Sequence, residues 1–325
     1  MNYNLLLPHP NPLHLGRGKI SGTQMKNLID IERLTKKEIE RLINSAQEFE
    51  KGRKTSAAAG KTACMMFFEN STRTHFSFEL AAKRLGMHVL NFDAKTSSFS
   101  KGESMKDTFE NLNFIGVDVF VLRHSENGII DKIRSEIAYP IRFVNAGDGK
   151  NAHPTQALLD FYTMKKHLGE IKGKKVVIIG DVAHSRVARS NLALLKKFDA
   201  DVHFCAPDYF TPKNIQDSGA IWHTNLEEAI ENTDVVMLLR VQNERLDCET
   251  AQKAKDYTKN YRLDSKMLEK LAPNALLMHP GPVNRGVEIT SELLDSEKGR
   301  TILEQAKNGV FVRMAVLDEI FREEA

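Results

Sequence analysis

The sequence predicts an α/β protein with two doubly wound parallel-sheet domains and an active site in the cleft between them. Two series of short, nearly continuous apolar segments alternate with stretches that carry apolar residues at three- and four-residue spacing. Such segments are typical of parallel strands that helices cover on both faces. Polar clusters follow the segments in both series, and open α/β sheets bind ligands at the carboxyl ends of their strands. Two such edges that face each other would form a cleft.

Length and composition agree with this fold class. A chain of 325 residues suits one large or two medium-sized domains, and 41% hydrophobic with 27% charged residues is usual for a soluble globular protein. The net charge of +3 indicates neither a nucleic-acid nor a membrane surface. We expect a cytoplasmic protein, because no signal peptide or long apolar span is recognisable. Cys64, Cys205 and Cys248 are far apart, which predicts reduced thiols and no metal site.

The expected strands form two series of four. They are residues 63–69, 88–92, 118–123 and 141–146 in the first series, and 174–180, 201–205, 234–240 and 275–279 in the second. We place the first domain at residues 1–152 and the second at 153–302, with the helix in TQALLDFYTMKKHLG as the bridge. The last helix, about 303–325, is assigned to the first domain, although its pattern would let it pack on either.

The stretch FFENSTRTHFSFELAAKRLG places three hydroxyls around one guanidinium, where an apolar segment passes into a helical pattern. Ser71 lies at the expected N-cap, and the pattern predicts a helix that turns Phe76, Leu80 and Leu85 inward. Helix N-termini favour anions, and the planar fork of Arg73 fits phosphate oxygens. We therefore expect a phosphate site, although a plain N-cap would give the same residues.

Two nucleotide-binding motifs are incomplete. AAAGKT ends like a P-loop, but Thr55 stands at the first glycine position and Gly60-Lys61-Thr62 precedes a strand instead of a helix. GDVAHSR follows a strand pattern but has only one glycine, which argues against a dinucleotide. The predicted ligand is a small phosphate compound.

Seven segments in order along the chain resemble one enzyme family: STRTHFSFE, FSKGES, LRHSENG, HPTQALLD, GDVAHSRVARSN, LLRVQNERL and MHPGPVNRGVEI. The sequence is similar to aspartate carbamoyltransferase catalytic chains from about residue 30 to its C-terminus. STRT and HPTQ are shared by the aspartate/ornithine carbamoyltransferase superfamily, whereas RVQNER and HPGP point to the aspartate branch. The resemblance implies attack of the L-aspartate amine on carbamoyl phosphate, which gives N-carbamoyl-L-aspartate and phosphate in pyrimidine synthesis. It implies no cofactor.

The resemblance also assigns roles to residues. Those implied to bind carbamoyl phosphate are Ser71, Thr72, Arg73, Thr74, Ser98, Arg123, His153, Gln156, Pro280, Gly281 and Pro282. Those implied to be catalytic are Arg73, Thr74, Lys101, Arg123 and His153. His153 would donate to the carbonyl oxygen, and Gln156 with two backbone carbonyls would hold the carbamoyl NH₂. A lone histidine is more often structural, but the HPTQ context favours a catalytic role.

Guanidinium groups are expected for the two carboxylates of aspartate. The resemblance assigns the binding of L-aspartate to Lys101, Arg186, Arg240 and Gln242. Arg240 directly follows an apolar strand pattern, whereas Arg186 by itself could be a helix-surface arginine, as could Arg189. The segment SSFSKGES by itself resembles a solvated surface loop. In the family this loop enters a neighbouring subunit's site, which implies a homotrimer with shared active sites. A regulatory or dihydroorotase chain is a further possible partner.

Three other readings stay open. An ornithine-type carbamoyltransferase would use an extra cation in place of the second carboxylate, but its HCLP and SMG elements are not found here. A non-catalytic homologue should have lost ligand groups, which this chain retains. A two-domain phosphate-sensing protein has only the phosphate site in its favour. His75 departs from the family pattern and receives no role, and Gly281 stands where some members have leucine.

Overall fold

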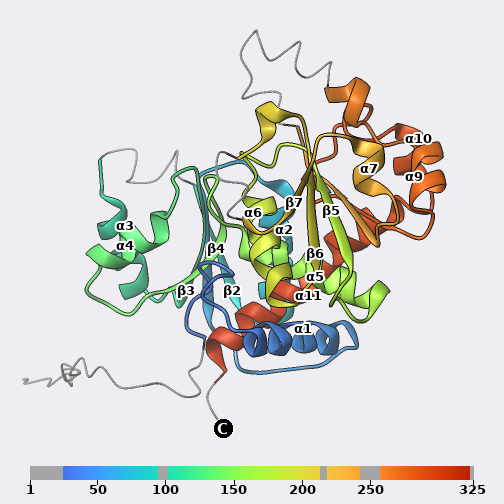
Figure 1. Ribbon diagram of the computed structural model, residues 1–325. Helices are drawn as coiled ribbons and strands as arrows, with labels where there is room; N and C mark the ends of the chain where they lie inside the picture. The colour runs from blue at the N-terminus through green and yellow to red at the C-terminus, as the bar shows by residue number, and fades with distance from the viewer. Residues whose placement is uncertain (1–24, 94–101, 213–217, 242–256, 323–325) are drawn as a thin grey trace, which may run out of the picture.

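Two parallel sheets stand side by side with helices on their faces, which confirms the predicted fold class (Figure 1). The structure is a computed structural model and describes residues 25–93, 102–212, 218–241 and 257–322. The first sheet has the strand order β2-β1-β3-β4 and the second has the order β7-β6-β5-β8-β9. All the described strand pairs are parallel.

The first sheet and its helices come from the N-terminal half of the chain. In order they are α1 (Lys36–Glu50), β1 (Thr62–Phe67), α2 (Thr72–Arg84), β2 (His88–Phe92), α3 (Met105–Phe114), β3 (Val119–His124), α4 (Ile129–Glu136) and β4 (Arg142–Asp148). The inner residues of β1 are all buried, because helices cover both faces of a parallel sheet. The helix α5 (Pro154–Leu168) then leads to the second sheet and packs against α6 and α11.

The second sheet contains one strand that the sequence pattern does not reveal. Its elements are β5 (Lys175–Ile179), α6 (Arg186–Lys197), β6 (Asp201–Cys205), η2 (Asp208–Phe210), β7 (Ile221–His223), α7 (Leu226–Ile230), β8 (Val235–Leu238), α9 (Ser265–Leu271), β9 (Leu276–Met278) and α10 (Ser291–Asp295). The unpredicted strand, β7, has three residues and lies at the sheet edge, half exposed, so it lacks a buried apolar run.

The orientation predicted for α2 is wrong in part. Leu85 is buried, but Phe76 is 62% exposed and Leu80 is 42% exposed. The buried residues of α2 are Thr74, Phe78, Ala81 and Ala82. These positions are three or four residues apart and share one face of the helix, which places Phe76 and Leu80 on the opposite side. Small alanines let α2 lie close to its neighbours, so the larger apolar residues are not the inward ones.

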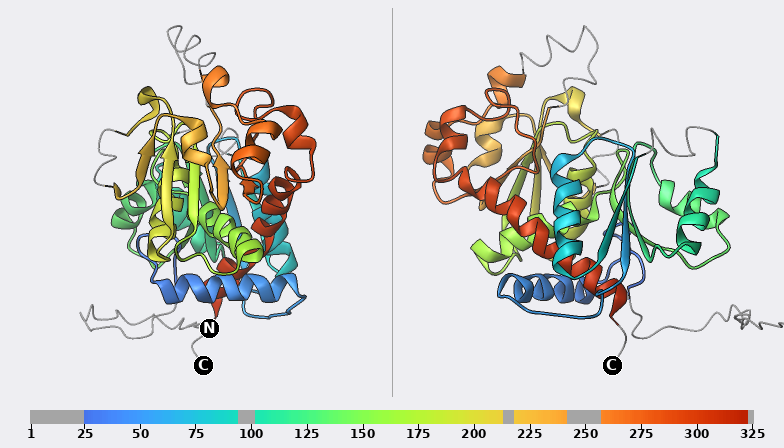
Figure 2. Two further views of the ribbon diagram at one scale, coloured as in Figure 1. Left: turned by 45° about the vertical axis from the view of Figure 1, so that its right-hand side comes forward. Right: turned by 180° about the vertical axis from the view of Figure 1, so that it is seen from behind.

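The last helix, α11 (Arg300–Phe321), runs across the molecule and ends near α1 (Figure 2). It packs against α1, α2 and α5, and also against β9 of the second sheet. Its buried Asp318 accepts hydrogen bonds from Arg53 Nη2 at 2.9 Å and Thr55 Oγ1 at 2.7 Å. No described helix is long and apolar enough to cross a membrane.

Candidate functional site

The junction of β1 and α2 leaves a helix N-terminus open at the carboxyl edge of the first sheet. Ser71 is the N-cap residue of α2, yet its side chain makes no capping hydrogen bond. By contrast, the Ser185 hydroxyl at the start of α6 accepts a hydrogen bond from the Ala188 N–H at 3.1 Å. The first N–H groups of a helix have no partners within the helix and attract anions. Ser71 is therefore available to a ligand.

Arg73 lies against the loop that follows β9 in the second sheet. A Cβ atom added to Gly281 would lie 2.8 Å from Arg73 Cζ, and Gly281 has a φ of +68°. Burial and the nearby Arg240 guanidinium both lower the pKa of Arg73. Burial, together with Arg73 and Arg240, also lowers the pKa of His279 to about 3. Arginines from two different sheets thus share one region that has an excess of positive charge.

A second pair of arginines meets at Glu69, which follows β1. Glu69 Oε2 accepts from both terminal nitrogens of Arg186 at 3.1 Å and lies 3.6 Å from Arg123 Nε. Arg123 also donates to the Ala146 carbonyl at 3.2 Å. A Cβ on Gly147 would lie 3.0 Å from Arg186 Cζ and 3.2 Å from Arg123 Nη1, so glycine makes the close approach possible. Glu69 connects the first sheet to the start of α6.

His153 is the N-cap residue of α5 and is buried next to these arginines. Its backbone N–H donates to Ser190 Oγ at 2.9 Å, whereas its Nδ1 atom is buried without a hydrogen-bond partner among the described residues. Burial lowers the pKa of His153 well below 6.5, and Arg123 and Arg186 lower it further. A buried polar atom without a partner is costly and suits a ligand-binding role. The imidazole is neutral at pH 7.

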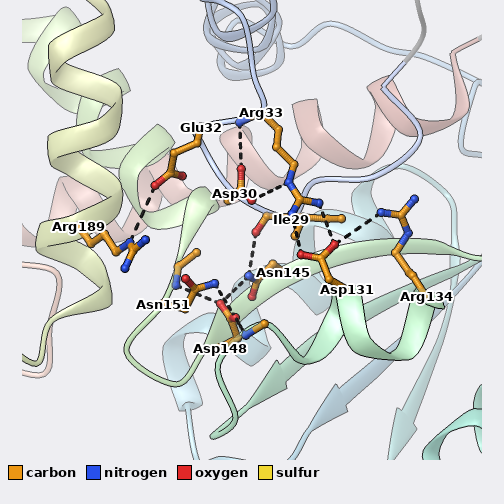
Figure 3. Close-up of polar contacts among 12 residues, drawn as sticks. Ile29, Asp30, Glu32, Arg33, Asp131, Arg134, Asn145, Asp148, Asn151 and Arg189 are labelled. Atoms are coloured by element: carbon orange, nitrogen blue, oxygen red, sulfur yellow. Dashed lines mark hydrogen bonds and ion pairs between the residues drawn. The ribbon is translucent and has the colours of Figure 1, made fainter. Parts of the chain in front are cut away.

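The loop between β4 and α5 is fixed by Asp148 (Figure 3). Its carboxylate accepts from Asn145 Nδ2 at 2.8 Å, Asn151 Nδ2 at 2.9 Å and the Ala152 N–H at 3.0 Å. It also accepts from the Gly128 N–H at 2.7 Å. These bonds hold the loop directly before His153 and so define where the imidazole lies.

A cavity of about 480 Å³ opens beside the Glu69 cluster. It is lined by Glu69, Ser125, Glu126, Asn127, Gly149 and Lys150. The Gly149 carbonyl accepts from Arg186 Nη1 at 3.1 Å, so the cavity adjoins the arginine pair. Small charged ligands could reach the arginines from this side.

The structure brings most of the expected site residues to facing strand ends. Ser71 to Thr74 and Arg123 come from the first sheet, and Arg186, Arg240 and Pro280 to Pro282 come from the second. Ser98, Lys101 and Gln242 lie outside the described residues. Arg189 is a surface residue, as its side chain is 62% exposed. Within the described chain, no group of three or more His, Cys, Asp or Glu side chains could hold a metal ion.

Three acidic residues beside these groups were not predicted from the sequence: Glu69, Asp148 and Asp160. Glu69 directly precedes Asn70 and STRT. A carboxylate at a strand end beside a predicted anion site indicates a partner for nearby arginines, and this signal could have been used. Asp148 is buried, and its loop partners Asn145, Asn151 and Ala152 lie within four residues of it, where the polar residues indicate only a ligand-binding edge. Asp160 is buried as well, but its partners Asn191 and Gln305 are 31 and 145 residues away, and no local pattern indicates it.

If the protein has the activity that the sequence resemblance implies, replacing Glu69 by glutamine should lower kcat/KM for the amine substrate about 10-fold. The change keeps the shape but removes the charge that holds Arg186 and Arg123 together, so the two guanidinium groups repel each other. Steady-state kinetics with each substrate varied would measure this. Glu126→Gln, at the exposed rim of the same cavity, is the control, and equal effects of the two changes would contradict the role given to Glu69.

The imidazoles of His153 and His279 should remain neutral at pH 6 in the folded protein, since burial lowers both pKa values. In the unfolded chain they take up protons near pH 6.5. Their contribution to the free energy of unfolding is therefore present above pH 6.5 and is lost as the pH falls. NMR titration, assigned with His153→Gln and His279→Gln, checks this. A midpoint at or above 6.5 for either signal in the folded state would refute it.

Comparison with known proteins gives one consistent family. Residues 26–166 match the sequence model of the aspartate/ornithine carbamoyltransferase carbamoyl-P binding domain, and residues 172–320 match that of the Asp/Orn binding domain. The aspartate carbamoyltransferase catalytic subunit of Flavobacterium psychrophilum is 44% identical over 298 residues, which cover 90% of this chain and 96% of that protein. The corresponding subunit of Christiangramia forsetii is 44% identical over 302 residues, with coverage of 91% and 96%.

Solved structures agree with these sequence matches. Trypanosoma cruzi aspartate transcarbamoylase in complex with N-(phosphonacetyl)-L-aspartic acid has a TM-score of 0.82 at 29% identity, and the match covers 93% of this chain and 98% of that one. Ornithine carbamoyltransferase from Pyrococcus furiosus has a TM-score of 0.81 at 26% identity, with coverage of 93% and 99%.

Proposed function

The chain belongs to the aspartate/ornithine carbamoyltransferase family, and we propose that it is the catalytic chain of an aspartate carbamoyltransferase. It transfers the carbamoyl group of carbamoyl phosphate to the amine of L-aspartate, and the products are N-carbamoyl-L-aspartate and phosphate. The observation that carries this proposal is the convergence of arginines from both sheets on one region: Arg73 with Arg240, and Arg123 with Arg186. Carbamoyl phosphate and aspartate are both anions and repel each other, so a site that holds them side by side needs several positive charges.

In the proposed mechanism, the first domain holds carbamoyl phosphate. The phosphate accepts hydrogen bonds from Ser71, Thr72, Arg73 and Thr74 at the N-terminus of α2, where the helix dipole adds positive potential. Arg123 reaches a phosphate oxygen and the carbonyl oxygen. Because phosphate departs with its electron pair, these groups stabilise the charge that develops on it.

His153 and Gln156 act on the carbamoyl group itself. A neutral imidazole can donate one N–H to the carbonyl oxygen, where negative charge grows as the amine attacks. The carbamoyl NH₂ has only donors, so it needs acceptors. The Gln156 side-chain oxygen and the backbone carbonyls of Pro280 and Gly281 are proposed to supply them, with Pro282 and Ser98 completing the pocket.

Arg186 and Arg240 are proposed to bind the carboxylates of aspartate, assisted by Lys101 and Gln242. Guanidinium forks bind carboxylates in a bidentate manner and would repel the extra ammonium of ornithine. The domain division is part of the same proposal: residues 1–152 with about 303–325 hold carbamoyl phosphate, and residues 153–302 hold aspartate.

One assay tests the assignment. Purified protein is given carbamoyl phosphate with either L-aspartate or L-ornithine, and carbamoylated product is measured. We expect product from aspartate only. Product from ornithine only would identify the ornithine enzyme, and no product from either would favour a non-catalytic homologue.

We further propose a homotrimer with shared active sites. An exposed apolar face on α2 and β2 supports it, because Phe76, Leu80 and Leu90 are 62%, 42% and 45% exposed on packed neighbouring elements. Exposed apolar side chains on adjacent elements are typical of subunit contacts. The proposal also includes a cytoplasmic location and a role in pyrimidine synthesis. It further includes the binding of a regulatory or dihydroorotase chain. The buried free thiols of Cys64 and Cys205 suit a reducing compartment.

Mixing two inactive variants tests whether sites are shared. If Lys101 of one subunit completes the Arg73 site of the next, Arg73→Ala and Lys101→Ala chains should restore each other after refolding together. Each mixed trimer then has one intact site, so an equal mixture should regain about a quarter of the parent activity. A Lys101→Ala chain with full activity, or a mixture without any rescue, would contradict shared sites.

A further inference from the structure

Asp160 lies in the middle of α5 and is completely buried, with 0% of its surface exposed. Its carboxylate accepts hydrogen bonds from three side-chain amides on three different helices. These are Gln156 Nε2 on α5 at 2.8 Å, Asn191 Nδ2 on α6 at 2.8 Å and Gln305 Nε2 on α11 at 2.5 Å. The mechanism described above gives Asp160 no contact with a substrate. A buried carboxylate destabilises the folded protein unless hydrogen bonds or an opposite charge compensate for its lost hydration.

The bond to Gln156 determines which end of that amide faces the site. A carboxylate only accepts, so the amide nitrogen of Gln156 must point toward Asp160. The amide oxygen is then the atom that remains for a ligand. This is the orientation that a carbamoyl NH₂ requires, because that group offers donors alone. In the reversed orientation Gln156 would present its own NH₂ to the carbamoyl NH₂.

The bond to Gln305 has a second consequence. The Gln305 amide nitrogen donates to Asp160, and the Gln305 amide oxygen accepts from the backbone N–H of His279 at 3.0 Å. His279 Nδ1 in turn accepts from the Gly281 N–H at 2.8 Å. The chain Asp160–Gln305–His279–Gly281 therefore fixes the loop whose Pro280 and Gly281 carbonyls are the other proposed acceptors.

Asp160 is suited to this role when it is ionised. Burial raises its pKa to about 6, whereas the three amides and Arg313 act in the opposite direction. Arg313 is buried on α11 and stacks over Phe78, with its Cζ 4.9 Å from the ring centroid. At pH 7 the carboxylate is mainly charged and offers acceptors only.

We propose that Asp160 is a positioning residue that sets the orientation of the Gln156 and Gln305 amides, and thereby aligns the three acceptors that hold the carbamoyl NH₂. The inference rests on the proposed function. It adds Asp160 to the residues of the proposed site, and Asp160 links the carbamoyl pocket to α6 and α11. The phosphate site at the N-terminus of α2 meets this network only where Arg73 lies against Gly281.

The test compares two ligands on folded variants by isothermal titration calorimetry. Carbamoyl phosphate needs the NH₂ acceptors, whereas inorganic phosphate needs only the α2 site and Arg123. Asp160→Ala should weaken carbamoyl phosphate binding about 10- to 100-fold and lower the affinity for inorganic phosphate far less. Thr163→Val is the matched control, since Thr163 is equally buried on α5 and bonds to Asn308 Nδ2 at 2.9 Å. It should leave both affinities unchanged.

Asp160→Asn separates orientation from charge. The asparagine oxygen can still accept from Gln156 and Gln305, which both bond to Oδ1 of Asp160. Its NH₂ would face Asn191 Nδ2 and can donate to Asn191 Oδ1 once the Asn191 amide turns over and gives up its bond to the Val187 carbonyl. This variant should therefore recover most of the carbamoyl phosphate affinity that Asp160→Ala loses. If circular dichroism shows that Asp160→Ala is unfolded, Gln305→Met replaces it and should show the same selective loss.

Three outcomes would overturn the proposal. They are parental carbamoyl phosphate affinity in the folded Ala or Met variant, equal losses for both ligands, and an Asn variant as weak as the Ala variant. A parent protein that binds carbamoyl phosphate but forms no carbamoyl aspartate would refute the proposed function instead. The two failures are thus distinguishable.

Discussion

Arg73→Ala should lower kcat/KM about 10²- to 10⁴-fold while the protein stays folded. Arg73 lies at the start of α2 against Gly281, and it is the one residue of STRT with a charge to set against phosphate. Its loss removes a charge-assisted contact that strengthens as phosphate leaves, so kcat should fall along with carbamoyl phosphate affinity. Steady-state kinetics measure the effect, and circular dichroism checks the fold.

The control for Arg73→Ala is Lys83→Ala in the last turn of the same helix. Lys83 pairs with Glu79 at 2.7 Å on an exposed surface, and such a pair contributes little. Its removal should change kcat/KM by less than about twofold. If Arg73→Ala retains most of the parent activity, the α2 N-terminus is not the phosphate site and the mechanism fails.

Arg186→Ala should raise the KM for aspartate about 100-fold and change the KM for carbamoyl phosphate far less. Arg186 is only 13% exposed and faces the opposite domain through Glu69, so it is placed to receive a carboxylate as the cleft fills. In the variant Glu69 still lies next to Arg123, so its carboxylate does not lose all positive neighbours and the rest of the site should keep its arrangement.

Arg189→Ala provides the matched comparison one helical turn away. Arg189 is on the same helix, α6, but is exposed and lies 3.9 Å from Glu32 (Figure 3). We expect parental values of both KM constants for this variant. Equal increases from Arg186→Ala and Arg189→Ala would show a general electrostatic effect of α6 instead of a specific carboxylate contact.

The fold class and most of the strands could be predicted because parallel strands buried on both faces leave long apolar runs in the sequence. Strands such as β1 and β5 have such runs. The edge strand β7 has none, since it is short and half exposed. The orientation of α2 was missed for a related reason: a tightly packed helix face uses alanines, and apolar periodicity gives these less weight than Phe76 and Leu80.

The roles proposed for the arginines came from the family resemblance, whereas their places at one edge could be predicted because each follows a strand or opens a helix. The network behind them could not. Asp160 becomes important only when Gln305, 145 residues further along the chain, is folded against it. Hydrogen bonds of this kind depend on tertiary packing, and no local spacing encodes them.

The packing of α11 has a consequence for how the protein forms during synthesis. This helix covers α1 and α2, although more than two hundred residues separate it from either of them. An emerging chain that has already completed the first sheet would still expose apolar surface on both helices until Val310 to Phe321 leave the ribosome. The first half therefore cannot mature independently in the usual N-to-C order. The apolar faces of α1 and α2 stay uncovered until α11 has been synthesised, and until then the nascent chain is a natural client for chaperones.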